Sequence, residues 1–182
     1  MPEVPEGYEI SFVGADYEQI VDRDLTVYQP LVTKTVKMNF NVKKAGDDST
    51  AVDSKEYTMT VTGKYTAEDG DNAKPNVIPE LAEWKGAKGG SFEISDSSRI
   101  VVATKDKAEL SAMAEEFKND YKEITGKSIE IVYADQASAG DFFFTLEAAG
   151  NGLKEEGYSM NVTDKVEVKA EQKAGAYWST RT

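Results

Sequence analysis

The sequence predicts an α+β protein built from two parts. Residues 8–65 are rich in Val, Thr, Tyr and Phe at alternating positions, which is typical of half-buried strands. Residues 106–127 carry one clear amphipathic helical pattern, with strand patterns on both sides of it. We therefore expect an all-β module, sandwich-like with an immunoglobulin-like arrangement as one option. An α+β domain follows it, with a mostly antiparallel sheet and helices on one face.

The N-terminal part shows its clearest strand in "KTVKMNFNVKK", residues 34–44, where apolar and polar side chains alternate. Residues 56–65 repeat this alternation. Residues 8–14 and 25–32 are expected as earlier strands, with Pro30 marking an edge position or a strand end. Residues 45–54 are polar and without apolar period, so a loop is expected there. The predicted module spans residues 1–66.

The next segment, "TAEDGDNAKPNVIPE", combines turn-forming residues with Pro75 and Pro79. It predicts a linker over residues 67–78, followed by a second domain over residues 79–182. In this domain, strands are expected near residues 92–94 and 99–103, before the helix. Further strands are expected at residues 128–134, 141–148, 157–162 and 165–171, and a last helix begins near Ala174.

The long helix is predicted from apolar residues that recur every three or four positions and from Gly126, which stands where a C-terminal cap belongs. This spacing places the apolar residues in one stripe that faces the core. The stripe consists of Leu110, Met113, Phe117, Tyr121 and Ile124.

Composition excludes several classes of function. Thirty-three acidic residues against 21 basic ones give a net charge of −12, which disfavours nucleic acid and anionic membrane surfaces as partners. No apolar run is long enough to span a bilayer, so membrane insertion is not expected. The chain has no Cys and no His, and so lacks thiol nucleophiles, zinc–thiolate sites and the commonest general base. No catalytic residue, cofactor site or metal site is expected.

Three stretches carry a resemblance to a known family: "VIPELAEWKGAKGGSFEISDSSRIVV", "YKEITGKSIEIVY" and "EEGYSMNVTDKVEVKAEQKAGAYWSTRT". Over about residues 74–182 the chain resembles the second, non-catalytic domain of glycoside hydrolase family 20, the β-N-acetylhexosaminidases and lacto-N-biosidases. The matching residues are Pro79, Trp84, Glu156, Gly157, Tyr158, Gly175, Tyr177 and Trp178.

The chain also departs from the family pattern. Met160 stands where Leu is usual, and Ser179 and Arg181 replace the family's common Gly and Gln, which points to a divergent bacterial branch. Family 84, the O-GlcNAcase-like enzymes, carries a similar domain and is an alternative, but the segment "IPELAEW" favours family 20.

The resemblance implies that the helix beginning near Ala174 leads into a catalytic (β/α)₈ barrel. In the family, an adjacent Asp–Glu pair in that barrel performs hydrolysis: the Glu is the general acid, and the Asp orients the substrate's acetamido group. We expect the barrel to be missing from this chain, so the pair cannot be assigned to any of its residues. The implied role is the support of a secreted or cell-surface enzyme that acts on N-acetylhexosamine-containing glycans.

Three aromatic residues are candidate interaction sites. Tyr177 and Trp178 could form a sugar platform, but neighbours on a helix point about 100° apart and present no flat surface. We expect them instead to pack on the sheet and on the barrel of the same polypeptide. Trp84, close to the linker, is expected to be an inter-domain anchor rather than a sugar-stacking residue.

Two alternative functions make different demands on the sequence. A freestanding glycan-binding or adhesion module would present exposed aromatic residues on one sheet face of the N-terminal module. The tyrosines available for this are Tyr8, Tyr17, Tyr28, Tyr57 and Tyr65. A complete small enzyme is disfavoured, because the only suggestive acid pair, Glu155 and Glu156, would point to opposite faces of a strand.

Overall fold

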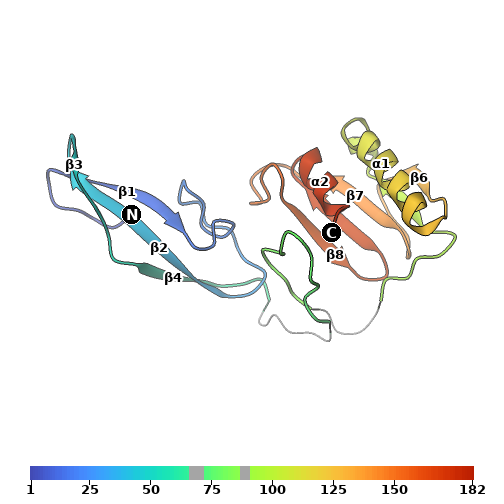
Figure 1. Cartoon of the computed structure of the whole chain (residues 1–182), viewed down its shortest axis with the longest axis horizontal. Coiled ribbons are helices and arrows are strands. Elements are labelled where there is room, and N and C mark those ends of the chain that lie inside the picture. The colour runs from blue at the N-terminus through green and yellow to red at the C-terminus, as the bar shows by residue number, and fades with distance from the viewer. Residues whose placement is uncertain (66–71, 87–90) are drawn as a thin grey trace. The chain divides into compact units, whose positions relative to one another are not determined.

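The computed structural model describes residues 1–65, 72–86 and 91–182, which form two compact units, Met1–Lys88 and Gly89–Thr182 (Figure 1). Part of the predicted linker, residues 67–71, lies outside the described residues. Residues 79–86, which the sequence assigns to the second domain, group with the first unit. Each unit is described by itself below.

The first unit contains a single antiparallel sheet organised around one long strand. Its strands are β1 (Tyr8–Ala15), β2 (Lys34–Lys44), β3 (Asp47–Asp53) and β4 (Tyr57–Val61). Strand β2 pairs with β1 along one side, and with both β4 and β3 along the other (Figure 1). At 11 residues, β2 is long enough to pair with two short strands end to end.

The alternation predicted for residues 34–44 is confirmed. Val36 and Phe40 are buried, whereas Lys37 between them is exposed. The buried side chains Ile20, Val21 and Val36 form the centre of this unit's core. Ile20 and Val21 lie in the connection between β1 and β2. This connection therefore folds over the sheet and packs its apolar side chains on it.

The predicted sandwich is therefore not observed: the described residues of the first unit contain one sheet, with the β1–β2 connection packed on it in place of a second sheet. Residues 25–32 form isolated bridges rather than a strand, and Leu25 has a positive φ of 66° that interrupts extended backbone.

Residues 45–54, expected as a loop, contain β3. Gly46, with a φ of 77°, permits the tight turn from β2 into this edge strand.

The second unit has five strands and two α-helices. They are β5 (Arg99–Val102), α1 (Lys107–Thr125), β6 (Glu130–Tyr133), β7 (Phe142–Leu146), β8 (Tyr158–Val162), β9 (Val166–Ala170) and α2 (Lys173–Ser179), with a short 3₁₀ turn, Thr104–Asp106, before α1. The α+β class is confirmed. The predicted strand near residues 92–94 is not formed; the ring of Phe92 instead packs edge to face against that of Phe142, with the ring centroids 4.9 Å apart.

The sheet order is β6-β5-β7-β9-β8, and three of the four strand pairs are parallel. Only the β8–β9 hairpin is antiparallel. The expectation of a mostly antiparallel sheet is therefore wrong for this unit. The reason is that helix α1 connects β5 to β6, and a helical crossover returns the chain to the same end of the sheet, so that the two strands run parallel.

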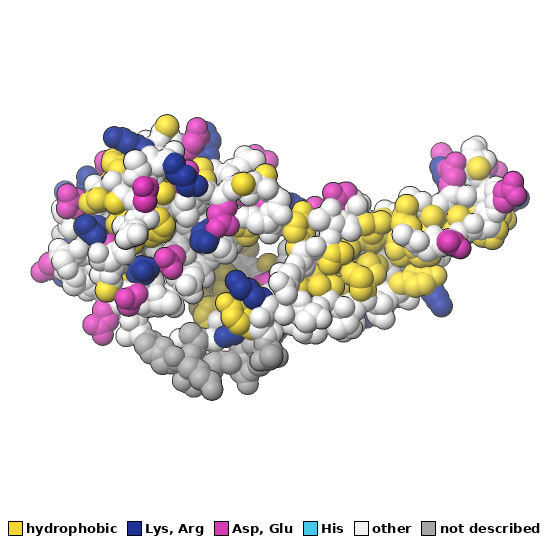
Figure 2. All heavy atoms as spheres, turned by 180° about the vertical axis from the view of Figure 1, so that it is seen from behind, with side chains coloured by type: hydrophobic (Ala, Val, Ile, Leu, Met, Phe, Trp, Pro, Cys, Tyr) yellow, Lys and Arg dark blue, Asp and Glu magenta, His cyan; other side chains and the backbone are white. Residues whose placement is uncertain are grey.

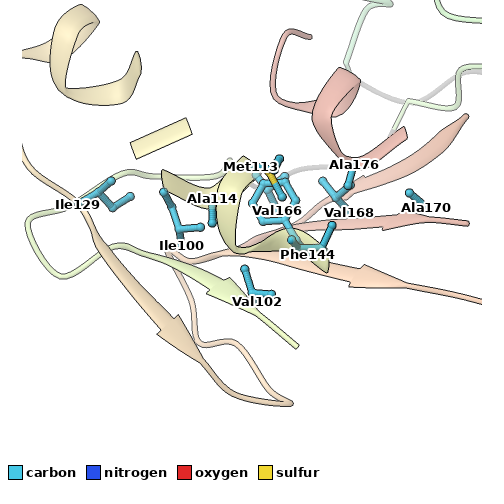
Figure 3. Close-up of a cluster of buried hydrophobic side chains, with 11 residues drawn as sticks. Ile100, Val102, Met113, Ala114, Ile129, Phe144, Val166, Val168, Ala170 and Ala176 are labelled. Atoms are coloured by element: carbon cyan, nitrogen blue, oxygen red, sulfur yellow. The ribbon is translucent and has the colours of Figure 1, made fainter. Parts of the chain in front are cut away.

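Both helices lie on one face of this sheet, as predicted, because each contacts the strands and the two helices also contact each other (Figure 1). They cover the cluster of buried apolar side chains shown in Figure 3, which includes Ile100, Val102, Phe144 and Val168 from the strands. Leu110 and Met113 of α1 are also buried in it. Burial of this cluster is the main stabilising contribution to the unit.

Helix α1 ends as predicted at Gly126, which adopts the left-handed conformation and donates its N–H to the Lys122 carbonyl. The apolar stripe contributes to the core from Leu110 to Tyr121. Ile124 is 83% exposed, which corrects its predicted core position. Ile124 lies at the C-terminal end of the helix, next to its last residue, Thr125.

Candidate functional site

The candidate interaction site is the C-terminal helix α2, which lies directly on the sheet because its inner residues are small. Gly175, Ala176 and Ser179 are buried. A Cβ atom at Gly175 would lie 2.1 Å from the carbonyl oxygen of Gly157, the residue before β8. The absence of side-chain atoms there allows helix and strand backbones to come into contact. The larger residues, Tyr177 and Trp178, are left at the side of the helix and on its outer surface.

Tyr177 and Trp178 have different environments. Tyr177 is half-buried and packs against the main core cluster, whereas Trp178 is 45% exposed. Their rings meet edge to face, with centroids 5.3 Å apart and an interplanar angle of 69°. The two rings therefore do not form a flat platform. Tyr177 instead fixes the orientation of the exposed indole, an arrangement that is favourable for aromatic pairs.

Arg181 ties this helix to α1. Its guanidinium binds Glu116 at 2.6 Å and also Asp120, and it lies over the Tyr177 ring, 4.7 Å from the centroid. Partial burial lowers the pKa of Arg181, but the hydrogen bond and charge of Asp120 outweigh this effect and raise the pKa above its ordinary value. The contact holds both Arg181 and the Tyr177 ring in a single arrangement.

Strand β8 adds two further apolar side chains on the side of the sheet that the helices cover. Met160 and Val162 stand opposite the buried Val168 and Val166, so they point to the same face. They are nevertheless 38% and 47% exposed, because β8 is the edge strand. We call Tyr177, Trp178, Met160 and Val162 the helix-side apolar surface. The alternation in β8 located Met160 and Val162 on one face, but their exposure depends on the edge position and was not predicted.

Trp84 belongs to the first unit and is half-buried. Its neighbours on both sides contact that unit. Glu83 accepts a hydrogen bond from the Leu31 backbone N–H at 2.9 Å, and the Lys85 ammonium lies 4.6 Å from the Tyr65 ring centroid. The segment that carries Trp84 is thus fixed on the β-sheet unit, and its role as an inter-domain anchor stays a prediction.

The described ranges show neither a metal-binding cluster nor a membrane-spanning helix. In residues 1–65, 72–86 and 91–182 there is no group of three acidic side chains arranged to hold a metal ion. Within the same residues, neither helix has the length and apolar character needed to cross a bilayer. Glu155 and Glu156 precede β8 in the connection from β7 and are both exposed.

Comparison with known proteins agrees with the resemblance found in the sequence. A family model described as glycosyl hydrolase family 20, domain 2, matches residues 74–182, the same span that the motifs indicated. A comparison with curated proteins finds no match. The matched region includes β5 to β9, both helices, Trp84 and the aromatic pair on α2. Since it covers more than half of the chain, the protein belongs to glycosyl hydrolase family 20, through the family's non-catalytic second domain.

Proposed function

We propose that this chain supports and positions the catalytic (β/α)₈ barrel of a secreted or cell-surface β-N-acetylhexosaminidase-type enzyme, which acts on N-acetylhexosamine-containing glycans. The second unit docks onto the barrel of the same polypeptide through its helix-side apolar surface. The observation that carries the proposal is the exposed indole of Trp178, held in place by Tyr177 on the last helix of a domain of family 20.

The geometry around Trp178 has the properties of an interface anchor. Tryptophan residues contribute disproportionately to the free energy of binding when a partner buries them. The Tyr177 ring and the Arg181 contacts hold α2 before any partner binds, so little conformational entropy is lost on docking. Arg181 is itself paired with two carboxylates, and therefore we assign it a role in holding the helix rather than in contacting sugar.

The proposal predicts that Trp178→Ser weakens docking of the barrel. In the complete polypeptide encoded by the gene, the loss of a buried indole from this contact should cost about 2 kcal/mol of inter-domain stability. The readout is heat inactivation, measured as residual hydrolysis of 4-nitrophenyl N-acetyl-β-glucosaminide, and the substitution should lower the temperature of half-inactivation.

Ile124→Ser is the matched control, because it also replaces an exposed apolar side chain of the same unit by serine, on α1. It should leave the temperature of half-inactivation unchanged. Equal effects of the two substitutions would contradict docking through Trp178. A complete polypeptide that does not hydrolyse this substrate would contradict the enzymatic role altogether.

The first unit favours a second candidate function, glycan binding by its β-sheet. Tyr8 and Tyr57 are 44% and 36% exposed, and strand register places both on the face that carries Phe12 and Phe40. Hydrophobic side chains gather over the strands of this unit on the side shown in Figure 2. Binding of glycans that is abolished by Tyr57→Ser and unaffected by Trp178→Ser would assign recognition to this sheet.

A further inference from the structure

The second unit contains a hollow of about 990 Å³ on the side of the carboxyl ends of its parallel strands. Residues 103–105 follow β5, Asp135 follows β6, residues 145–151 end β7 and continue beyond it, and Lys169 is close to the end of β9. The volume is at the upper end of the range of about 300–1,000 Å³ that is usual for small-molecule sites.

The position of the hollow follows from the strand order. From β5 the chain passes through α1 to β6 on one side of the sheet, whereas β7 lies on the other side of β5 and continues to β8 and β9. The connection from β5 to β6 and the connection from β7 to β8 therefore leave the sheet in opposite directions. Between them a crevice opens at the ends of β5 and β7. In open sheets with parallel strands, crevices of this kind are the preferred place for ligands.

One wall of the hollow is fixed before any ligand arrives. Asp106, at the start of α1, is buried and its Oδ2 accepts hydrogen bonds from the Leu146 N–H at 2.8 Å and the Thr145 hydroxyl at 3.0 Å. These bonds attach the end of β7 to the beginning of the helix. The Lys105 ammonium additionally donates to the carbonyl of Leu146. A preformed wall reduces the entropic cost of binding.

An aromatic ring contributes to the apolar part of the lining. Phe142 and Phe144 pack with the helix-covered core, so Phe143 between them points to the opposite face of the sheet. Phe143 is half-buried and lines the hollow together with the apolar residues Leu146 and Ala148. The C–H-bearing face of a sugar ring is apolar and can pack on a ring of this kind.

The polar part of the lining is electrically neutral, although the chain as a whole carries a charge of −12. The lining contains two cationic side chains, Lys105 and Lys169, and two anionic ones, Asp135 and Glu147. The Lys169 ammonium binds Glu147 Oε1 at 2.8 Å, and the Asn151 amide donates to Glu147 Oε2 at 3.1 Å. The Lys169 and Glu147 side chains are 50% and 37% exposed, so both remain accessible to a ligand.

This lining selects for hydroxyl and amide groups. A charged ligand would have to displace one partner of the Lys169–Glu147 pair, whereas a hydroxyl group both donates and accepts and can join the existing network. The hydrogen bond from Lys169 lowers the pKa of Glu147, with Asn151 contributing, so the carboxylate remains an acceptor at neutral pH.

We propose that the hollow between the ends of β5 and β7 binds a neutral sugar, one or two hexose units of a glycan. The sugar packs on Phe143 and is hydrogen-bonded by Glu147, Asn151 and Lys169. Such a site would give the non-catalytic domain a contact of its own with a glycan chain. The inference rests on the lining of the hollow and does not depend on the docking role of Trp178.

The test is a titration of the ¹⁵N-labelled chain, residues 1–182, with N-acetylglucosamine, its β-1,4-linked dimer or glucose, followed by amide chemical shifts. We expect saturable shifts in residues 103–105, 143–148, 151 and 169, with affinity in the range of about 1–10 mM for at least one sugar. Sodium sulfate is the anionic comparison and should produce no saturable shifts at these residues.

Two variants define the contacts. Phe143→Leu keeps an apolar side chain and removes the aromatic ring, and Lys169→Ala removes one donor; each should weaken binding at least about fivefold. Lys127→Ala, at an exposed lysine that pairs with the exposed Asp96, is the matched control and should not change affinity. Well-dispersed spectra establish that each variant is folded.

The proposal is overturned if no sugar gives saturable shifts up to about 50 mM, or if Phe143→Leu binds as the unsubstituted chain does. Saturable binding of sulfate in place of sugars would also overturn it. Shifts confined to Tyr8 and Tyr57 would assign the sugar to the first unit instead. None of these outcomes depends on the heat-inactivation experiment with Trp178→Ser, so failures of the two proposals can be told apart.

Discussion

Replacing Gly175 by alanine is expected to destabilise the second unit by about 3 kcal/mol. The new Cβ atom would lie 2.1 Å from the Gly157 carbonyl oxygen and 3.2 Å from the Cβ of Ala170. The nearest atom belongs to backbone, which cannot rotate away as a flexible side chain can. Helix α2 must therefore move away from β8 and β9, and it carries Ala176 out of the core as it moves.

Hydrogen exchange measures this effect where it arises. Amide protection should fall in α2 and β8 and remain unchanged in the strands of the first unit, because the substitution acts only on the packing of the second. Gly14→Ala is the control: its Cβ would approach only Glu18 Oε1, at an ordinary 4.0 Å, and its φ is not positive. Unaltered protection of α2 in Gly175→Ala would show that the helix is not packed as described.

Replacing Asp141 by asparagine is expected to cost about 2 kcal/mol at neutral pH. The Asp141 side chain is only 1% exposed and accepts a hydrogen bond from the Ser138 N–H at 2.8 Å. Arg99 donates to the same carboxylate from its backbone N–H at 3.1 Å, from Nε at 3.1 Å and from Nη2 at 2.6 Å. Asparagine removes the charge, and it replaces an acceptor oxygen with an amide that faces donors.

The effect of Asp141 should depend on pH in a defined direction. Burial raises the pKa of Asp141, but the hydrogen bonds from Arg99 and from the Ser138 N–H outweigh burial and lower the pKa below its ordinary value of 3.8. A carboxyl group with a lowered pKa in the folded state binds its proton more readily when unfolded. Its contribution to stability is thus complete above pH 3.8 or so and is lost as pH falls through the lower, folded-state pKa.

Urea denaturation at several pH values measures this contribution. The difference in free energy of unfolding between the unsubstituted chain and Asp141→Asn should be constant between about pH 5 and pH 8 and should shrink below about pH 4. Asp96→Asn is the control, because this carboxylate is 91% exposed and its pair with Lys127 is solvated; it should change stability by less than about 0.5 kcal/mol. A difference that grows on acidification would contradict the assigned pKa direction.

Local patterns were sufficient to predict most elements of the second unit and its family. The apolar spacing of α1 and the glycine at its end define that helix, and the alternation on both sides of residues 163–165 defines the β8–β9 hairpin. The aromatic pair on α2 was also found from sequence, because Gly175 and the residues after it form part of a recognisable motif. These features depend on residues close together in the chain.

The errors have a common physical origin. Strand β3 is an edge strand, exposed on most of its residues, so it has no apolar alternation to reveal it. Residues 25–32 are rich in apolar residues, but they form part of a loop beside the sheet, with isolated bridges at Val27 and Val32 and a positive φ at Leu25. Ile124 has the spacing of the helical stripe, yet it lies at the end of α1 and is exposed.

By itself the sequence determined the helices, most strands of the second unit, the aromatic pair on α2 and the resemblance to family 20. Only the tertiary structure decided that β5, β6, β7 and β9 run parallel, that residues 79–86 group with the first unit, and that four separate segments meet around one hollow. The physical reason is that periodicity records which side of an element is buried. Periodicity contains no information on which strand will be the neighbour, in which direction that strand runs, or how far along a helix the apolar stripe is buried.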